Sequence, residues 1–130
     1  MKILVVEDDP IVRTNLVMHL RDDLGHEVVE AGHALDAVDK LMPGAKLDET
    51  FDVIITDMKM RRDQSGLWLL QYLNRSRVRL RCLLRSSEAT YRDHGEDIDL
   101  KDVEEAFDFV KFRLKDNNFK DVDEFLTVRH

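Results

Sequence analysis

The sequence predicts an α/β fold in which a doubly wound, five-stranded parallel sheet carries helices on both faces. Val53, Ile54 and Ile55 form an uninterrupted apolar run, and Lys2–Val6 has the same character. Strands without polar alternation are buried on both faces, as the central strands of parallel sheets are. Strand-like and helix-like segments then alternate along the chain. This order predicts parallel strands joined by right-handed helical crossovers.

Length and composition predict one small globular domain, residues 1–130, with a heavily charged surface. One hundred and thirty residues suffice for one continuous core, and although the chain is only 43% hydrophobic and 36% charged, its apolar residues cluster in periodic blocks. Its formal net charge of −7 disfavours a general nucleic-acid-binding role. The lone cysteine, Cys82, cannot form an internal disulfide, and no apolar run approaches the roughly 20 residues needed to cross a bilayer. Because the N-terminus leads directly into a strand, without a signal peptide, we expect a cytoplasmic protein that binds no membrane.

The first third of the chain predicts strand, helix, strand and helix in that order. After the strand Lys2–Val6, Asp9 can cap a helix and Pro10 suits its first turn. This helix ends before Gly25, and its apolar positions at a spacing of four are Val12, Leu16 and Leu20. The β-branched segment His26–Glu30 predicts the second strand. A second helix has its apolar positions at Ala34, Ala37, Val38 and Leu41.

The middle third predicts the third strand, the third helix and the fourth strand. The apolar strand Phe51–Asp57 is followed by a charged loop, Met58–Ser65. Gly66–Leu73 predicts the helix, and Arg77–Ser86 predicts the next strand.

Arginine is frequent around this fourth strand. We interpret the alternating arginines as a solvated strand entrance rather than a nucleic-acid-binding stripe; they are Arg75, Arg77, Arg79 and Arg81. Arg85 lies inside the expected core strand, and a buried arginine needs a partner. Asp108 is one candidate.

The last third leaves one choice open. Asp99–Ala106 predicts a helix, and a terminal helix includes Phe119, Val122, Phe125 and Leu126. The segment Phe107–Phe112 between them fits both the strand period and the helix period. We favour a strand because it completes a five-stranded sheet.

Acidic side chains follow two of the buried strands at the point where each strand ends. Asp57 ends the third strand, and Glu7, Asp8 and Asp9 come directly after the first. Open α/β sheets place their ligand crevices at the carboxyl ends of the strands, so these carboxylates should form one acidic pocket. There are simpler alternatives. The acids after the first strand could be a helix-capping turn, although a cap needs only one acid, and Asp57 could be a turn residue at a strand end.

Together these residues resemble the receiver domain of response regulators, the phosphate-accepting module of two-component signalling. The resemblance begins with the run Ile3–Pro10 and continues through the strand that ends on Asp57. It also includes Gly66-Leu67 and the segment Ser86–Ala89, and so covers essentially the whole chain. It implies a flavodoxin-like sheet with the strand order 2-1-3-4-5.

The resemblance also implies a role for each site residue. Asp57 is similar to the residue that accepts the phosphoryl group. Ser86 matches the hydroxyl residue that contacts this group, and Lys111 is the candidate for the cationic partner. The implied magnesium ligands, completed by one backbone carbonyl, are Glu7, Asp8, Asp57 and Lys59.

Such a domain would take its phosphoryl group from a histidine of a sensor histidine kinase or a phosphotransfer protein, with Mg²⁺ as cofactor. A divalent ion would relieve the repulsion among the clustered acids. Inward movement of Ser86 would remodel the neighbouring surface, and the signal would pass to a downstream protein by contact. The implied chemistry is self-phosphorylation and autodephosphorylation at most, not metabolic catalysis.

Departures from the family pattern support an alternative. The family usually has proline after the methionine of the acceptor loop and after the cationic lysine, whereas Met60 precedes Arg61 and Lys111 precedes Phe112. The alternative is a degenerate receiver that acts as a phosphorylation-independent protein-interaction module. A magnesium-dependent phosphohydrolase on a similar sheet is disfavoured, because Lys59 stands where its second acid would be.

Overall fold

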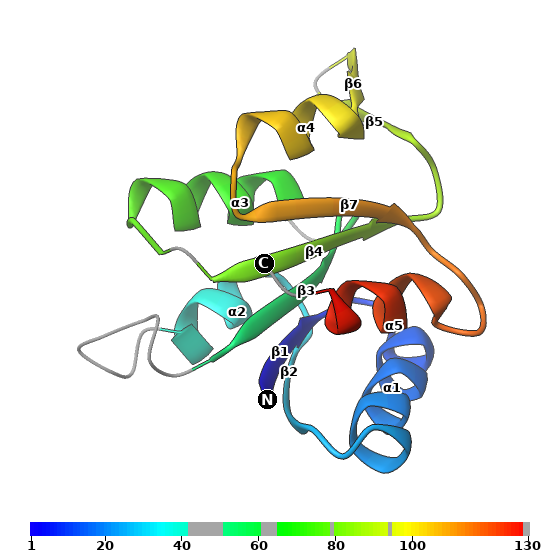
Figure 1. The fold of residues 1–130 in the computed structure, drawn as a ribbon. Helices are drawn as coiled ribbons and strands as arrows, with labels where there is room; N and C mark the ends of the chain where they lie inside the picture. The colour runs from blue at the N-terminus through cyan, green and yellow to red at the C-terminus, as the bar shows by residue number, and fades with distance from the viewer. Residues whose placement is uncertain (42–50, 61–64, 79, 94, 129–130) are drawn as a thin grey trace.

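The computed structural model describes residues 1–41, 51–60, 65–78, 80–93 and 95–128. Five strands form one parallel sheet in the order β2-β1-β3-β4-β7 (Figure 1). These strands are β1 (Lys2–Val6), β2 (Glu27–Ala31), β3 (Val53–Asp57), β4 (Arg81–Ser86) and β7 (Val110–Leu114). The predicted fold class and strand order are therefore confirmed, with β7 as the fifth strand of the sheet.

Helices cover both faces of this sheet. On one face lie α1 (Pro10–Met18), its π-helical continuation η1 (His19–Asp23) and α5 (Lys120–Thr127). On the other face lie α2 (Ala34–Leu41), α3 (Gly66–Arg75) and α4 (Leu100–Ala106). Within the described residues, no helix is long and apolar enough to cross a bilayer.

The strand β1 shows how the sheet separates two cores. Ile3 and Val5 pack in the core beneath α1 and α5, while Leu4 and Val6 pack in the core beneath α2, α3 and α4. All four side chains are at most 1% exposed. Successive side chains of a strand point to opposite faces, so a strand covered on both sides must be apolar at every position. The uninterrupted apolar runs in the sequence have this cause.

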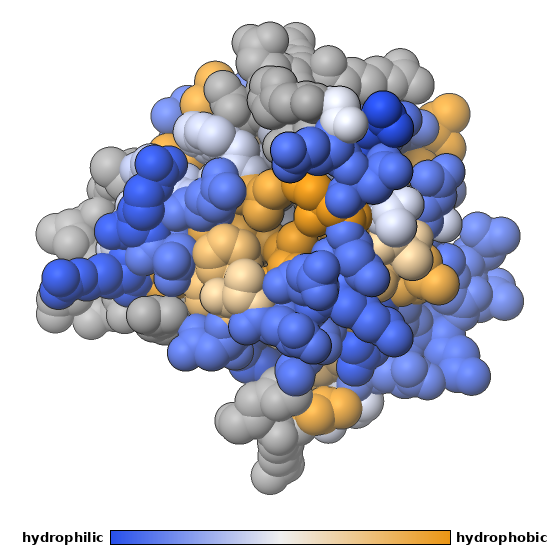
Figure 2. All heavy atoms as spheres, turned by 90° about the horizontal axis from the view of Figure 1, so that it is seen from above, coloured by the Kyte–Doolittle hydropathy of each residue, from blue (hydrophilic) through white to orange (hydrophobic). Residues whose placement is uncertain are grey.

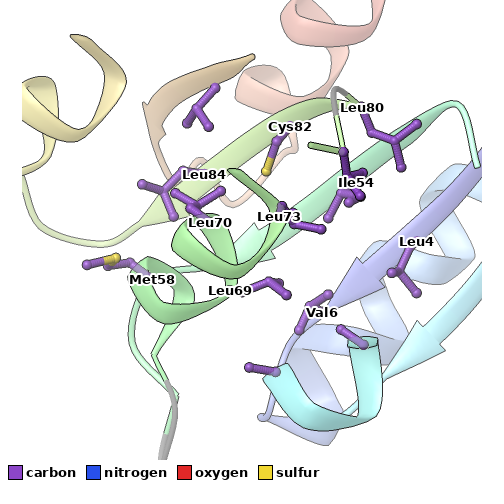
Figure 3. Packing of buried hydrophobic residues seen from close by; sticks show 14 of the residues in the cluster. Leu4, Val6, Ile54, Met58, Leu69, Leu70, Leu73, Leu80, Cys82 and Leu84 are labelled. Atoms are coloured by element: carbon purple, nitrogen blue, oxygen red, sulfur yellow. The ribbon is translucent and has the colours of Figure 1, made fainter. Parts of the chain in front are cut away.

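The helix α3 packs its leucines onto the central strands β3 and β4. Leu69, Leu70 and Leu73 are at most 1% exposed and belong to the same core as Ile54 of β3 and Cys82 of β4 (Figure 3). Burying one leucine side chain contributes about 1.5–3 kcal/mol. These contacts hold α3 against β3 and β4.

A two-stranded antiparallel hairpin between β4 and α4 was not predicted. It consists of β5 (Thr90–Asp93) and β6 (Glu96–Asp99) and lies beside α4 at the top of Figure 1. Tyr91 and Ile98 face each other across the hairpin and pack against the core. Its strands are short and mostly polar, so they lack the apolar run that indicates a buried strand. Seen from above, this side of the molecule shows an apolar area among hydrophilic residues (Figure 2).

The open choice in the last third resolves as a strand, but three residues later than predicted. Phe107 follows the last turn of α4, where its N–H still donates to the carbonyl of Val103 at 3.2 Å. The strand β7 begins at Val110 and ends at Leu114. Its carboxyl end therefore lies beyond Phe112, the last residue of the predicted strand.

Candidate phosphoacceptor site

Three carboxylates converge at the carboxyl edge of the sheet, as the sequence predicts. Glu7 and Asp8 directly follow β1, and Asp57 is the last residue of β3, which pairs with β1. One carboxylate oxygen from each of the three lies within 4.8 Å of the others. Glu7 and Asp57 are only 4% and 7% exposed. The parallel pairing of the two strands thus brings these acids into one partly buried cluster.

Helix capping explains one neighbouring acid but not this cluster. Asp9 caps α1, since its Oδ1 accepts hydrogen bonds from the backbone N–H groups of Ile11 at 2.9 Å and Val12 at 3.3 Å. Pro10 occupies the first turn. The predicted cap is confirmed, and it accounts for Asp9 alone. The backbone carbonyl of Glu7 is held separately, by Nη1 of Arg13 at 2.7 Å.

Burial of Glu7 and Asp57 shifts the pKa of each carboxyl. Burial raises the pKa of Glu7 to about 7, and the charge of Asp57 adds to the rise. Burial also raises the pKa of Asp57, against the opposing attraction of Lys115. Desolvation and like charge both disfavour ionised carboxylates, and a cation between them reverses both effects.

Lys115 supplies one positive charge to the cluster. Its Nζ lies 3.2 Å from Oδ1 of Asp57 and 3.3 Å from Oε2 of Glu7. Lys115 comes directly after Leu114, the last residue of β7, and its backbone N–H donates to the carbonyl of Ser86 at 2.9 Å. The lysine therefore stands at the same sheet edge as the acids.

The predicted position of the cation, Lys111, does not reach this cluster. Lys111 is the second residue of β7, pairs with Leu83, and lines a different hollow of about 270 Å³ with Arg113 and Phe125. The prediction placed the lysine on a strand that began too early. Asp57 and Ser86 each end a strand, so a cation directed at them must follow the last residue of β7. That requirement identifies Lys115.

The acidic cluster and Lys115 line a second hollow, which has a volume of about 510 Å³. The remaining predicted site residues, Ser86 and Lys59, line this hollow too. Ser86 ends β4, and its Oγ accepts a hydrogen bond from the backbone N–H of Glu88 at 3.2 Å. Lys59 also lines the hollow, and a hydrogen bond from its backbone lowers the pKa of Asp57 in opposition to burial. The sequence did not predict that the hairpin contributes Thr90, Tyr91 and Arg92 to the wall.

The partner predicted for Arg85 was wrong. Asp108 precedes β7 at the amino edge of the sheet, whereas Arg85 lies near the carboxyl end of β4. Arg85 instead binds Asp121 of α5, with Nε 2.6 Å from Oδ2 and both side chains 4% exposed.

This donor set fits Mg²⁺. Magnesium is a hard cation that takes carboxylate and carbonyl oxygens, and it keeps several positions for water or phosphate. The three clustered carboxylates, two of them with a raised pKa, are held close enough to share one ion.

A comparison with protein families identifies the family to which the chain belongs. The model described as the response regulator receiver domain matches residues 3–122. The chain belongs to the response regulator receiver family. The sequence resemblance is thereby confirmed, and the family works in two-component signalling.

Curated relatives are longer than this receiver. The chain is 26% identical over 129 residues to the sensory transduction protein LytR of Staphylococcus haemolyticus, covering 91% of the chain and 48% of the relative. It is 43% identical over 75 residues to the transcriptional regulatory protein FlgR of Helicobacter pylori, covering 56% of the chain and 17% of the relative. The receiver thus spans about half of the first protein and a sixth of the second.

Solved structures share the receiver fold. The response regulator TrrA of Thermotoga maritima, in complex with Mg²⁺ and BeF, superposes with a TM-score of 0.71 at 25% identity, covering 96% of this chain and 95% of that one. The non-phosphorylated HemR receiver domain of Leptospira biflexa superposes with a TM-score of 0.74 at 20% identity, covering 99% and 96%.

Proposed function

We propose that this receiver accepts a phosphoryl group on Asp57, with Mg²⁺, from a phosphohistidine of a sensor histidine kinase or a phosphotransfer protein. The observation that carries the proposal is the position of the Asp57 carboxylate. One of its oxygens lies within 4.8 Å of an oxygen of Glu7 and of Asp8, and its Oδ1 lies 3.2 Å from Nζ of Lys115, which also contacts Glu7. The 510 Å³ hollow beside it gives room for an incoming phosphoryl group.

The chemistry is a nucleophilic displacement at phosphorus. A carboxylate oxygen of Asp57 forms a bond to phosphorus while the P–N bond to the donor imidazole breaks, and the imidazole leaves with that electron pair and takes up a proton. The transition state of phosphoryl transfer is loose and rich in negative charge, so the site must mainly position and neutralise. The Lys115 ammonium, 3.2 Å from the nucleophile, meets this need.

Magnesium would be held by Glu7, Asp8, Asp57 and the backbone carbonyl of Lys59. When bound, the ion would neutralise the charge of the acids and of the incoming phosphoryl group. Lys115 is the cationic residue of the proposal in place of Lys111.

The signal would leave through Ser86 and the segment that follows it. The Ser86 Oγ accepts the N–H of Glu88, so the hydroxyl lies at the start of the connection to β5. Donation of that hydroxyl to a phosphoryl oxygen would shift this connection and with it the hairpin. A downstream protein that contacts the altered surface would then read the modification. We propose a cytoplasmic location and no direct binding to nucleic acid or membrane.

Phosphorylation by a small donor tests this proposal. The protein would be incubated with Mg²⁺ and acetyl phosphate and then measured by intact mass, with Asp57→Asn as the control. We expect an adduct of one phosphoryl group on the parent and none on the variant. An unmodified parent, with no Mg²⁺-dependent change in Trp68 fluorescence, would instead support the phosphorylation-independent interaction module.

A further inference from the structure

We propose that Arg85 is a positioning residue for phosphoryl transfer, which holds Lys115 against Asp57 through the carboxylate of Asp121. The proposal rests on the function proposed above and adds residues that lie outside the acidic cluster. It assigns to a buried ion pair between β4 and α5 the task of shaping the backbone that carries the cationic side chain.

The ion pair between Arg85 and Asp121 is buried and bidentate, with two hydrogen bonds. Nε of Arg85 donates to Oδ2 of Asp121 at 2.6 Å, and Nη2 donates to Oδ1 at 3.3 Å. Each side chain is 4% exposed. The guanidinium also lies 5.8 Å from the ring of Phe119, which precedes α5.

The same carboxylate reaches the loop of the lysine. Oδ1 of Asp121 accepts the backbone N–H of Asp116, the residue after Lys115, at 3.2 Å. The N–H of Lys115 itself donates to the carbonyl of Ser86, the residue after Arg85, at 2.9 Å. The backbone of Lys115 is therefore fixed on one side by β4 and on the other by Asp121, and Arg85 orients Asp121.

A lysine side chain needs such support. It has four rotatable methylene links and loses about 2 kcal/mol of rotamer entropy when it is fixed. The residue after Lys115 is Asp116, whose backbone can rotate about φ, whereas a proline would lock that angle. The hydrogen bond to Asp121 restrains the same peptide unit by other means.

Stability alone is a poor reason for this ion pair. Moving two charges out of water costs free energy, and well-packed apolar residues often replace a buried pair with equal or greater stability. An apolar pair, however, has no oxygen to accept the N–H of Asp116. Substitution can therefore separate the contribution of the pair to stability from its role in holding the backbone of Asp116.

The test compares two paired replacements. Arg85→Met/Asp121→Leu removes the acceptor, whereas Arg85→Gln/Asp121→Asn keeps an amide oxygen at the position of Oδ1. We expect both to unfold cooperatively at a temperature near that of the parent. With Mg²⁺ and acetyl phosphate, we expect the Met/Leu protein to be phosphorylated about ten-fold more slowly and the Gln/Asn protein to stay within about three-fold of the parent. Equal rates for the Met/Leu protein and the parent would overturn the proposal.

A cycle with Lys115→Met separates positioning from a general structural role. If Arg85 and Asp121 act through the lysine, the Met/Leu replacement should cause no further loss of rate in the Lys115→Met protein. A further ten-fold loss in that background would contradict the proposal.

Amide hydrogen exchange tests the positioning without any phosphoryl transfer, so it separates failure of this inference from failure of the proposed function. In the parent we expect the Asp116 amide to be protected, and in the Met/Leu protein to exchange at least about ten-fold faster, while the amides of β1 stay unchanged. An Asp116 amide that exchanges in the parent as freely as an open loop would overturn the inference even if the Met/Leu protein did not fold.

Discussion

Gly66 lies directly against the backbone of Asp57. A Cβ at position 66 would collide with the carbonyl oxygen of Asp57 and would lie 2.9 Å from Cα of Met58. The N–H of Gly66 also donates to the carbonyl of Met58 at 2.9 Å. The first residue of α3 is therefore packed onto the end of β3, and the position of Asp57 depends on the absence of a side chain there.

Gly66→Ala should destabilise the protein and displace the backbone of Asp57 and Met58. The neighbours of this Cβ are backbone atoms of Asp57 and Met58, which cannot rotate away, so we expect a loss on the order of 1–3 kcal/mol in the free energy of unfolding. Urea denaturation measures it. Gly32→Ala is the matched control, because its Cβ would come no closer than 3.4 Å to any neighbour, the Nη1 of Arg13. Equal stability of the two variants would contradict the close packing at Gly66.

Two lysine variants should separate the cation of the site from the predicted one. Lys115→Met removes the ammonium beside Asp57, so we expect phosphorylation by acetyl phosphate to slow by at least about ten-fold. Lys111→Met removes a lysine of the same chemistry from the separate hollow near α5, and the rate should not change. Initial rates from intact mass at saturating Mg²⁺ give the comparison. A larger effect at Lys111 would refute the assignment of Lys115.

Without metal, the protein should lose stability as the pH rises toward 8. Because burial and the charge of Asp57 raise the pKa of Glu7 from 4.5 to about 7, the folded state binds more protons than the unfolded state between these values. The free energy of unfolding therefore falls with increasing pH across this window, by on the order of 1–3 kcal/mol for this carboxyl. Urea unfolding in EDTA at pH 5 and pH 8 measures the difference. Glu7→Gln should remove most of it.

Added Mg²⁺ should oppose this loss. Protons and the ion compete for the same carboxylates, so we expect the magnesium dissociation constant to decrease between pH 6 and pH 8. Titration calorimetry at several pH values checks this. A magnesium affinity that does not change over the range would show that Glu7 does not take part in binding.

His19 should stabilise the packing of η1 against α5 only at lower pH. Burial of the ring alone would lower its pKa, but hydrogen bonds to Asp123 at 2.6 Å and Asp23 at 2.9 Å outweigh this and raise the pKa. The contribution is thus full below the ordinary value of 6.5 and is lost as the pH rises through the raised value. His19→Gln should therefore cost more stability at pH 5.5 than at pH 9. An equal cost at both would leave only the stacking on Phe119 as the contribution of the ring.

The sheet and the acidic cluster could be predicted because each is encoded locally. An apolar run that ends on a carboxylate specifies a strand and the residue at its carboxyl end. Glu7, Asp8 and Asp57 could therefore each be predicted from the short segment that contains it. Parallel pairing then brings such ends together without further information.

The cation could not be predicted because the bounds of β7 depend on tertiary contacts. The run Phe107–Phe112 fits two periods. Helix α4 ends at Ala106, as predicted, but the carbonyl of Phe107 then accepts the N–H of Val110 at 3.2 Å in a turn, so the strand starts only at Val110. Pairing with β4 then sets the register, with Leu114 opposite Ser86, which places Lys115 at the site. The hairpin was missed because its strands are short and mostly polar, and the packing of Tyr91 and Ile98 against the core is a tertiary contact that local patterns do not show.

The lone cysteine of the chain gives a natural probe of unfolding. Cys82 is fully buried between α3 and the sheet, and burial raises its pKa, so the thiol is shielded in the folded state. A maleimide dye would therefore label the wild-type protein only as fast as that core opens. A second cysteine introduced on the exposed hairpin could meanwhile carry a fluorophore without background labelling.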